Sequence, residues 1–280
     1  MLSPVARSRR LVVRCVALVV GLAAGAAVPS WVAADELADK GRELVAKHAP
    51  AVVWVTANIK QDMAAMGVQF GGMPGQAGER RTTAIGTVVD PSGIVVVATN
   101  RLKPPLGMVS MMIVDGEAKP IETKTELSKP VIQLADGTEV PARIALEDPD
   151  TGLTYLAPDK PLKEPLASMP PERAAELRQL DQVFQISREG KKLGTVPNVS
   201  IGRISAVLTK PRRGYVPGGA LRFGPYFDES GRFVGVASIQ TPKDIQVGFT
   251  DGEIITLIIP AADLAEAVAQ VRDQAANPAP

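Results

Sequence analysis

The sequence predicts an all-β body with a short helix at each end. Its 280 residues contain ten short runs rich in β-branched and aromatic residues, and no long helical pattern separates them. Turns rich in Asp, Gly, Ser and Pro bound the runs, as at 90–93 and 229–231. Many short strands of this kind are typical of antiparallel barrels or of a sandwich. The predicted strands are Val52–Ala57, Thr82–Val89, Ile94–Ala98, Val131–Leu134, Val140–Leu146, Leu153–Leu156, Val183–Ser187, Val199–Leu208, Phe233–Ile239 and Ile254–Ile259.

The remaining segments divide into helices and loops. Apolar residues at helical spacing predict a short amphipathic helix over residues 35–48 and a second helix after Pro260. The segment Gln61–Arg80 is rich in Gly, Met and Gln, which predicts a long loop. The segment Pro158–Arg178 begins with several prolines, and it predicts a linker between two halves of similar length.

The composition excludes several classes of protein. The 31 Lys and Arg residues nearly balance the 30 Asp and Glu residues, so no excess of charge indicates a nucleic-acid partner. Cys15 is the only cysteine and His48 the only histidine, which excludes an intrachain disulfide, a Cys-rich zinc site and a multi-His metal centre. We therefore expect no metal and no other cofactor. We expect His48 to be a surface or helix-capping residue.

The first 34 residues have the features of an export signal. Four arginines precede the apolar run Val16–Val28, which is shorter than the roughly 20 residues that a membrane span needs. Val32 and Ala34 occupy the two positions that a signal peptidase recognises. We expect cleavage after Ala34 and a periplasmic or secreted protein. The twin-arginine pathway is one option for the export route. The alternative is a signal that stays uncleaved as a membrane anchor. Cleavage removes Cys15, which excludes a cysteine nucleophile.

Seven segments, in order along the chain, resemble the HtrA (Deg) branch of the trypsin-like serine proteases. Ala49–Val55 is similar to the opening "PAVV" strand of that family, and Leu134–Glu139 is similar to its "LADG" turn. The predicted loop Gln61–Arg80 lies where the family carries a long variable loop. The other similar segments are Ala84–Gly93, Asp148–Thr151, Gly224–Asp228, Gly231–Val236 and Ile254–Pro260.

This resemblance implies a particular fold and division of the chain. The family folds as two antiparallel β-barrels, the trypsin-like or chymotrypsin fold, with short N- and C-terminal helices. We expect a signal peptide at 1–34, an N-terminal barrel lobe at 35–160 and a linker at 161–179. A C-terminal barrel lobe with the terminal helix at 180–275 and a tail at 276–280 complete the chain, and we expect no PDZ domain.

The three positions that carry catalysis in the family hold other residues here. Counting from the matched segments places the catalytic histidine at Asn100, the aspartate at Gly152 and the serine at Arg222. A serine nucleophile needs a base to accept its proton, and that base needs an orienting carboxylate. Asn100 is not basic near neutral pH, Gly152 has no side chain and Arg222 is a permanent cation. The resemblance therefore implies a protease fold without its catalytic triad.

The loop that supplies oxyanion donors in the family also differs. Its glycine-rich stretch corresponds here to Ala220, Leu221, Arg222 and Phe223. We expect these bulky side chains to alter the backbone whose N–H groups would bind an oxyanion. A Ser–Lys pair would need no histidine, and the serines available for one are Ser187, Ser200, Ser205 and Ser238.

These features lead to one preferred function and two alternatives. We expect an exported pseudoprotease that binds an extended polypeptide or a partner protein in the cell envelope, because the family binds substrate as an added strand. One alternative is an active HtrA-type serine endopeptidase with unrecognised catalytic residues. Another is a structural lobe of a larger envelope assembly. Lys210, Arg212, Arg213 and Arg222 form a local basic cluster, which we expect to be a solvated hairpin tip.

Overall fold

The computed structural model describes residues 30–61, 79–103, 111–114, 117–120, 125–171, 176–210, 212–219, 222–240 and 255–276. Residues 41–280 form one compact unit. Residues 1–40 form a second unit, of which the structure describes part of the helix α2 (Ser30–His48). The larger unit contains every described strand.

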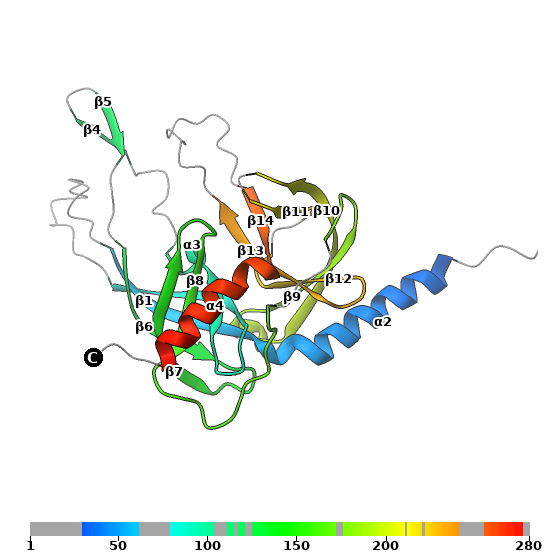
Figure 1. Cartoon of the computed structure of the whole chain (residues 1–280), viewed down its shortest axis with the longest axis horizontal. Helices are drawn as coiled ribbons and strands as arrows, with labels where there is room; N and C mark the ends of the chain where they lie inside the picture. Colours follow the sequence, from blue (N-terminus) through cyan, green and yellow to red (C-terminus); the bar gives the residue numbers. More distant parts are fainter. Residues whose placement is uncertain are drawn as a thin grey trace, which may run out of the picture. The chain divides into compact units, whose positions relative to one another are not determined.

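Two closed antiparallel β-barrels follow one another along the chain within the larger unit (Figure 1). The described residues give each barrel six strands, in the spatial orders β1-β2-β3-β8-β7-β6 and β10-β11-β14-β13-β12-β9. This arrangement confirms the predicted all-β fold of two barrels. The first barrel consists of β1 (Val52–Gln61), β2 (Glu79–Val88), β3 (Val95–Ala98), β6 (Thr125–Gln133), β7 (Glu139–Asp148) and β8 (Leu153–Pro158). The second consists of β9 (Gln182–Arg188), β10 (Pro197–Leu208), β11 (Gly214–Pro217), β12 (Pro225–Asp228), β13 (Phe233–Gln240) and β14 (Ile255–Pro260).

Short elements complete the fold. The hairpin of β4 (Met111–Val114) and β5 (Glu117–Pro120) is separate from both barrels, and the one-turn helix α3 (Thr99–Leu102) follows β3. Two 3-10 turns, η2 (Ala49–Ala51) and η4 (Lys191–Leu193), and the C-terminal helix α4 (Ala261–Ala276) are the remaining described elements.

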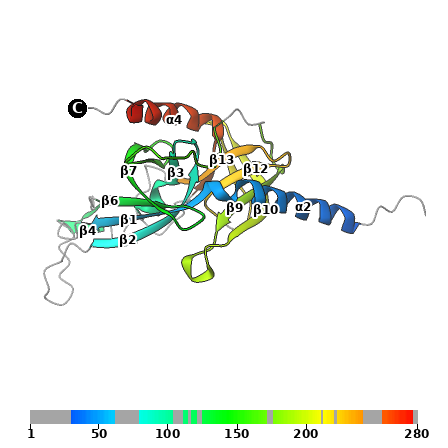
Figure 2. The same cartoon turned by 90° about the horizontal axis from the view of Figure 1, so that it is seen from below.

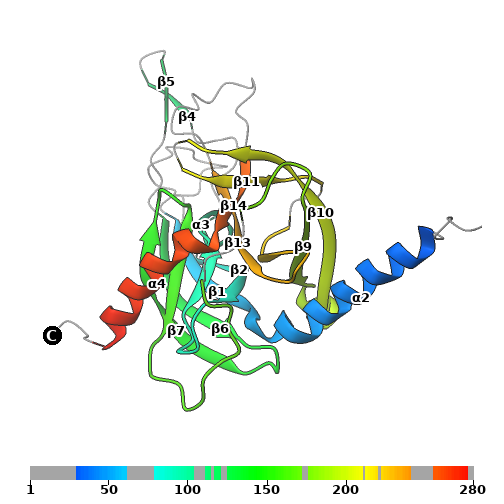
Figure 3. The same ribbon diagram turned by 45° about the vertical axis from the view of Figure 1, so that its right-hand side comes forward.

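Helix α4 covers one face of the first barrel and reaches the second. It packs against β7 and β8 of the first barrel and against β13 and β14 of the second (Figure 2 and Figure 3). Its apolar residues Leu264, Val268 and Val271 are buried in one cluster with Tyr155 of β8. Every residue from Leu153 to Ala157 is buried, because β8 has the barrel interior on one face and α4 on the other.

A second apolar cluster joins the two barrels. Leu44, near the end of α2, and Val53 of β1 share this cluster with Phe184 of β9 and Phe227 of β12, and all four side chains are almost completely buried. Burying such side chains stabilises the fold by roughly 1.5–3 kcal/mol each. The junction between the barrels is therefore a packed part of the core.

The ten predicted runs all coincide with strands, most of them longer than expected. The sequence prediction missed four strands, β4, β5, β11 and β12. Each of these has four residues, and three of them contain a proline or glycine that indicates a turn when the sequence is considered alone. Strands β1 and β2 extend into the ends of the predicted loop Gln61–Arg80, whose residues 62–78 lie outside the described part of the chain.

The predicted helices are both present. Helix α4 begins directly after Pro260, as expected. Helix α2 begins at Ser30 and not at residue 35, so it runs through the expected cleavage position after Ala34. The described residues of the predicted linker 161–179 contain no helix or strand. None of the described helices is long and apolar enough to cross a membrane.

Candidate functional site

Two of the three expected catalytic positions adjoin one another at the first barrel. Asn100 lies in α3, and the backbone N–H of its neighbour Thr99 donates to the carbonyl of Gly152 at 2.9 Å. The hydroxyls of Thr99 and Thr154 share a hydrogen bond of 2.9 Å. These bonds fix the helical turn that carries Asn100 against the turn that carries Gly152.

The turn at Gly152 follows from the local sequence. The carboxylate of Asp148 accepts the backbone N–H groups of Asp150 at 2.9 Å and Thr151 at 3.2 Å, as acidic residues at the start of turns commonly do. Gly152 then has a φ of +65°, a left-handed conformation that glycine adopts without strain. The position expected to hold a catalytic carboxylate is thus a turn glycine.

The second barrel contacts this turn through Ser238. Its side chain is fully buried, and its hydroxyl donates to the carbonyl of Gly152 at 3.1 Å. The carbonyl of Gly152 therefore accepts hydrogen bonds from both barrels. We call this region, with Asn100, Gly152, Ser238 and the loop at Arg222, the junction site.

The loop of Arg222 is held by two buried side chains of the second barrel. The hydroxyl of Tyr226 donates to the carbonyl of Arg222 at 3.1 Å, and the amide of Gln185 donates to the carbonyl of Phe223 at 3.0 Å. Burial raises the pKa of Tyr226 to about 12, so its hydroxyl keeps the proton that it donates. Gly224 follows with a φ of +130°, which strongly favours glycine.

Contacts across the barrels bring the Arg222 loop to the Asn100 helix. The guanidinium of Arg101, the residue after Asn100, lies over the ring of Phe223 at 5.0 Å from the ring centroid. The guanidinium of Arg222 lies 3.8 Å from a carboxylate oxygen of Glu189. The structure therefore brings neighbours of Asn100 and Arg222 into contact. Ala220 and Leu221, of the expected oxyanion loop, lie outside the described residues.

No side chain at the described part of the junction site has the chemistry of a catalytic base. The side-chain oxygen of Asn100 is buried without a hydrogen-bond partner among the described residues, and an amide cannot accept a proton near neutral pH. The hydroxyls of Ser200, Ser205 and Ser238 donate to oxygen acceptors, namely Gln185 and two backbone carbonyls, and none of these contacts is to a lysine.

His48 lies at a helix end, as expected, but it makes no capping bond and is only partly exposed. The centroid of its ring lies 4.6 Å from that of Phe227. Burial, with a smaller effect of Lys47, lowers the pKa of His48. Its Nε2 is buried and has no partner in the described structure. His48 is therefore a half-buried residue that packs against the core through Phe227.

The predicted basic cluster is divided between separate partners. Arg212 lies 3.9 Å from Asp150, and Arg213 pairs with Glu176. Arg222 pairs with Glu189 instead. Among the described residues, no group of three or more His, Cys, Asp or Glu side chains converges.

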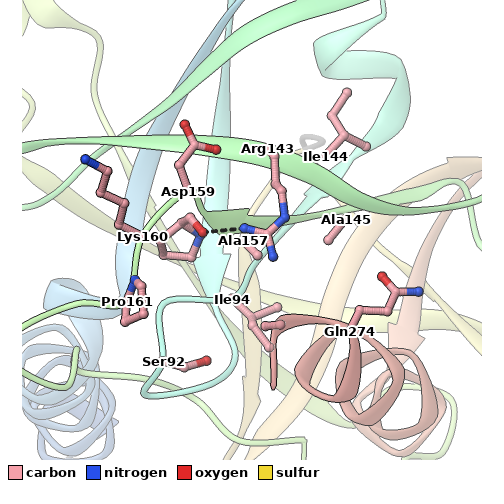
Figure 4. Close-up of a pocket in the computed structure, with 12 residues that line it drawn as sticks. Ser92, Ile94, Arg143, Ile144, Ala145, Ala157, Asp159, Lys160, Pro161 and Gln274 are labelled. Atoms are coloured by element: carbon pink, nitrogen blue, oxygen red, sulfur yellow. Dashed lines mark hydrogen bonds between the residues drawn. The ribbon is translucent and has the colours of Figure 1, made fainter. Parts of the chain in front are cut away.

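A cavity of about 890 Å³ lies apart from the junction site, between β7, β8 and the end of α4 (Figure 4). Arg143 on its wall donates to the carbonyl of Pro158 at 2.7 Å. The charged ends of Asp159 and Lys160 point in other directions than that of Arg143 (Figure 4). The polar groups of this cavity do not converge on one point, and we assign no function to it.

Sequence reasoning missed Arg101, Gln185 and Tyr226. Nothing in the sequence pairs Arg101 with Phe223, because the two residues lie on different barrels. Gln185 did carry a signal, since it is a polar residue inside the apolar run of a buried strand. A buried amide needs hydrogen-bond partners, and the carbonyls of the Arg222 loop supply one.

Comparison with known proteins identifies the fold. No protein-family model and no curated protein sequence matches the chain. Solved structures do match it. One is the HtrA-type protease AlgW, in a variant solved with tripeptide, with a TM-score of 0.50 and 18% identity. The match covers 82% of this chain and 62% of that chain. The chain has a trypsin-like, HtrA-type fold.

A second match is weaker. It is the apo form of the MamO protease domain from Magnetospirillum magneticum, with a TM-score of 0.47 and 16% identity over 79% of this chain and 97% of that chain. The fold assignment rests on the AlgW match, whose 18% identity shows the fold and nothing about activity. The assignment of Asn100, Gly152 and Arg222 to the catalytic positions of the HtrA-type fold stays a prediction.

Proposed function

We propose that the protein is an exported, catalytically inactive homologue of trypsin-like proteases that binds an extended polypeptide or a partner protein in the cell envelope. The chemistry of the junction site carries this proposal. Asn100, Gly152 and Arg222 supply no base, no orienting carboxylate and no nucleophile. A site without its triad retains at most about 10³–10⁴-fold catalysis over water, which is too little for useful proteolysis.

The surroundings of these residues support an inactive site. The only histidine of the chain is half-buried against the core residue Phe227, and this burial lowers its pKa. The buried hydroxyl of Ser238 is engaged with the carbonyl of Gly152. An active hydroxyl would need a base within hydrogen-bond reach in place of that carbonyl.

The end of β13 supports polypeptide binding. Strand β12 pairs with β13 only as far as Val236, whereas β14 pairs with it as far as Gln240. Within the described residues, Ser238 to Gln240 therefore have a ladder partner on one side only. An extended polypeptide can add to such an edge through main-chain hydrogen bonds. It would then pass beside Gly152, because Ser238 contacts that residue.

The AlgW variant of the same fold was solved with tripeptide. A binding mode based on main-chain hydrogen bonds depends on strand geometry and not on a catalytic triad. Peptide binding by this fold is therefore compatible with the loss of the residues that cleave.

Incubation with an unfolded protein tests the proposal. The purified full-length product is mixed with casein, and native mass spectrometry follows the mixture over hours. The proposal predicts a complex with intact casein and no fragments. Fragments that persist in the Arg222→Ala variant would contradict inactivity and indicate an unrecognised active site. Absence of both complex and fragments would contradict polypeptide binding.

Export is tested separately. The N-terminus of the protein recovered from the envelope fraction of cells is determined by mass spectrometry. The proposal predicts a chain that begins at Asp35. A chain that keeps residues 1–34 and remains in the membrane fraction would instead indicate a retained anchor.

A further inference from the structure

One arginine from each barrel lies next to Phe223 at the junction site, Arg101 through a ring contact and Arg222 as its neighbour in the chain. Arg101 of α3 is exposed and lies over the ring of Phe223, at 5.0 Å from the centroid. Arg222 precedes Phe223 in the chain, and its side chain is 44% exposed. Both groups are cationic at any physiological pH. The backbone N–H of Ala237 donates to the carbonyl of Gly224 at 3.3 Å, so the loop that carries Arg222 and Phe223 adjoins the edge of β13 to which an added strand would bind.

The carboxylates nearby neutralise only part of this charge. The side chain of Arg101 contacts Phe223, and no ion pair among the described residues joins Arg101 to a carboxylate. Glu189 lies 3.8 Å from Arg222, beyond hydrogen-bond distance, and its Oε1 accepts the amide of Asn198 at 2.6 Å. Glu147 is close to the junction but pairs with Lys103 at 2.6 Å. The described groups leave a net positive charge here.

The backbone of the loop adds two donors. The carbonyls of Arg222 and Phe223 accept the buried Tyr226 and Gln185 side chains. In a trans peptide the N–H of the next residue points opposite to the carbonyl, so the N–H groups of Phe223 and Gly224 point away from Tyr226 and Gln185. Neither N–H group donates to another described residue. Consecutive N–H groups and guanidinium groups are the donors that bind anions.

We infer that the junction site selects polypeptides that carry a carboxylate beside the Arg101–Phe223–Arg222 cluster. This inference rests on the proposed function, since it names the chemistry of the polypeptide bound there. A carboxylate is the anion that an unmodified polypeptide offers, and its two oxygens match the paired donors of a guanidinium. It comes either from a Glu or Asp side chain or from the C-terminus of the bound chain.

Matched peptides test this inference. Short randomised peptides are prepared in sets that contain Glu, Gln or Lys at the same positions, each with a free and an amidated C-terminus, and their dissociation constants are measured by fluorescence anisotropy. We expect Glu peptides to bind about tenfold more tightly than Gln peptides, with Lys peptides weakest. Retention of the preference in amidated peptides indicates a side-chain carboxylate; loss on amidation indicates the C-terminus.

Two variants locate the effect. Arg222→Gln and Arg101→Gln change exposed side chains and should fold normally, which circular dichroism checks. Each should reduce the Glu-over-Gln preference severalfold, whereas Arg178→Gln, whose side chain is 87% exposed outside the junction site, should leave it unchanged. Equal binding of Glu, Gln and Lys peptides would overturn the inference and leave the proposed function standing. If no peptide set binds, both fail.

Discussion

Arg188 of the second barrel binds the segment that leads into β1 of the first barrel. Its removal should lower the stability of both barrels together. Its guanidinium donates to the carbonyls of Ala49 and Val52, which precede and begin β1, and to that of Thr195 in its own barrel. Ala49 and Val52 are buried. Loss of the guanidinium leaves their carbonyls without a charged donor in a part of the core that water reaches poorly.

The magnitude follows from these bonds. A hydrogen bond from a charged donor contributes about 1.5–3 kcal/mol, and three bonds from one group do not add fully. We expect Arg188→Met, which keeps the length of the side chain, to lower the free energy of unfolding by about 2–4 kcal/mol. Domains of this kind are stable by about 5–15 kcal/mol, so the change should be large in urea unfolding followed by tryptophan fluorescence.

Arg178→Met is the matched control. The side chain of Arg178 is 87% exposed and its ion pair with Asp181 is 3.7 Å long, so its loss should change the free energy of unfolding by less than about 0.5 kcal/mol. If the two variants unfold at the same urea concentration, the hydrogen bonds of Arg188 do not stabilise the joined barrels and the reasoning is wrong.

Three further predictions concern the loop at the junction site and the dependence of stability on pH. Gly224→Ala should destabilise by about 3 kcal/mol, measured by urea unfolding, because the φ of +130° strains any other residue and the new Cβ would clash with the backbone carbonyl of Ile186 in β9. If Gly224→Ala and the wild type unfold at the same urea concentration, the loop does not have the conformation on which this prediction rests. Burial alone would raise the pKa of Asp90, but hydrogen bonds from Ser92 and from Arg272 of α4 outweigh burial and lower this pKa. The resulting stabilisation is present above about pH 4 and lost as the pH falls through the lowered pKa, so Asp90→Asn should be less sensitive to acid in thermal melts. Burial, then Lys47, lowers the pKa of His48, so wild-type stability should decline as the pH falls below about 6.5, and His48→Gln should flatten that decline.

The sequence predicts the barrels well because strand signals are local. Alternating apolar residues and Asp-Gly or Ser-Gly turns identify each long strand without knowledge of its partners. Strand β12 is different, since four residues that start with Pro225 carry little local signal. Its place between β9 and β13 depends in part on the pairing of Tyr226 with Gln185, which lies far from it in the sequence.

The contacts of the junction site could not be predicted from the sequence. The family resemblance assigns Asn100, Gly152 and Arg222 to the catalytic positions by counting along the chain, and this assignment stays a prediction. The contact of Arg101 with Phe223 joins residues of two barrels, and no periodicity or spacing encodes it. The burial of His48 likewise depends on Phe227 from the second barrel. Such contacts arise only when the two barrels pack together.

Photo-crosslinking at Phe223 tests the central claim most directly. A photoreactive phenylalanine analogue replaces Phe223 in one protein and Leu180, an exposed residue outside the junction site, in another. Each is irradiated with unfolded casein, and the adducts are identified by mass spectrometry. Binding without catalysis predicts adducts of intact casein at position 223 and few at position 180. Cleaved casein, or equal adducts at both positions, would contradict it.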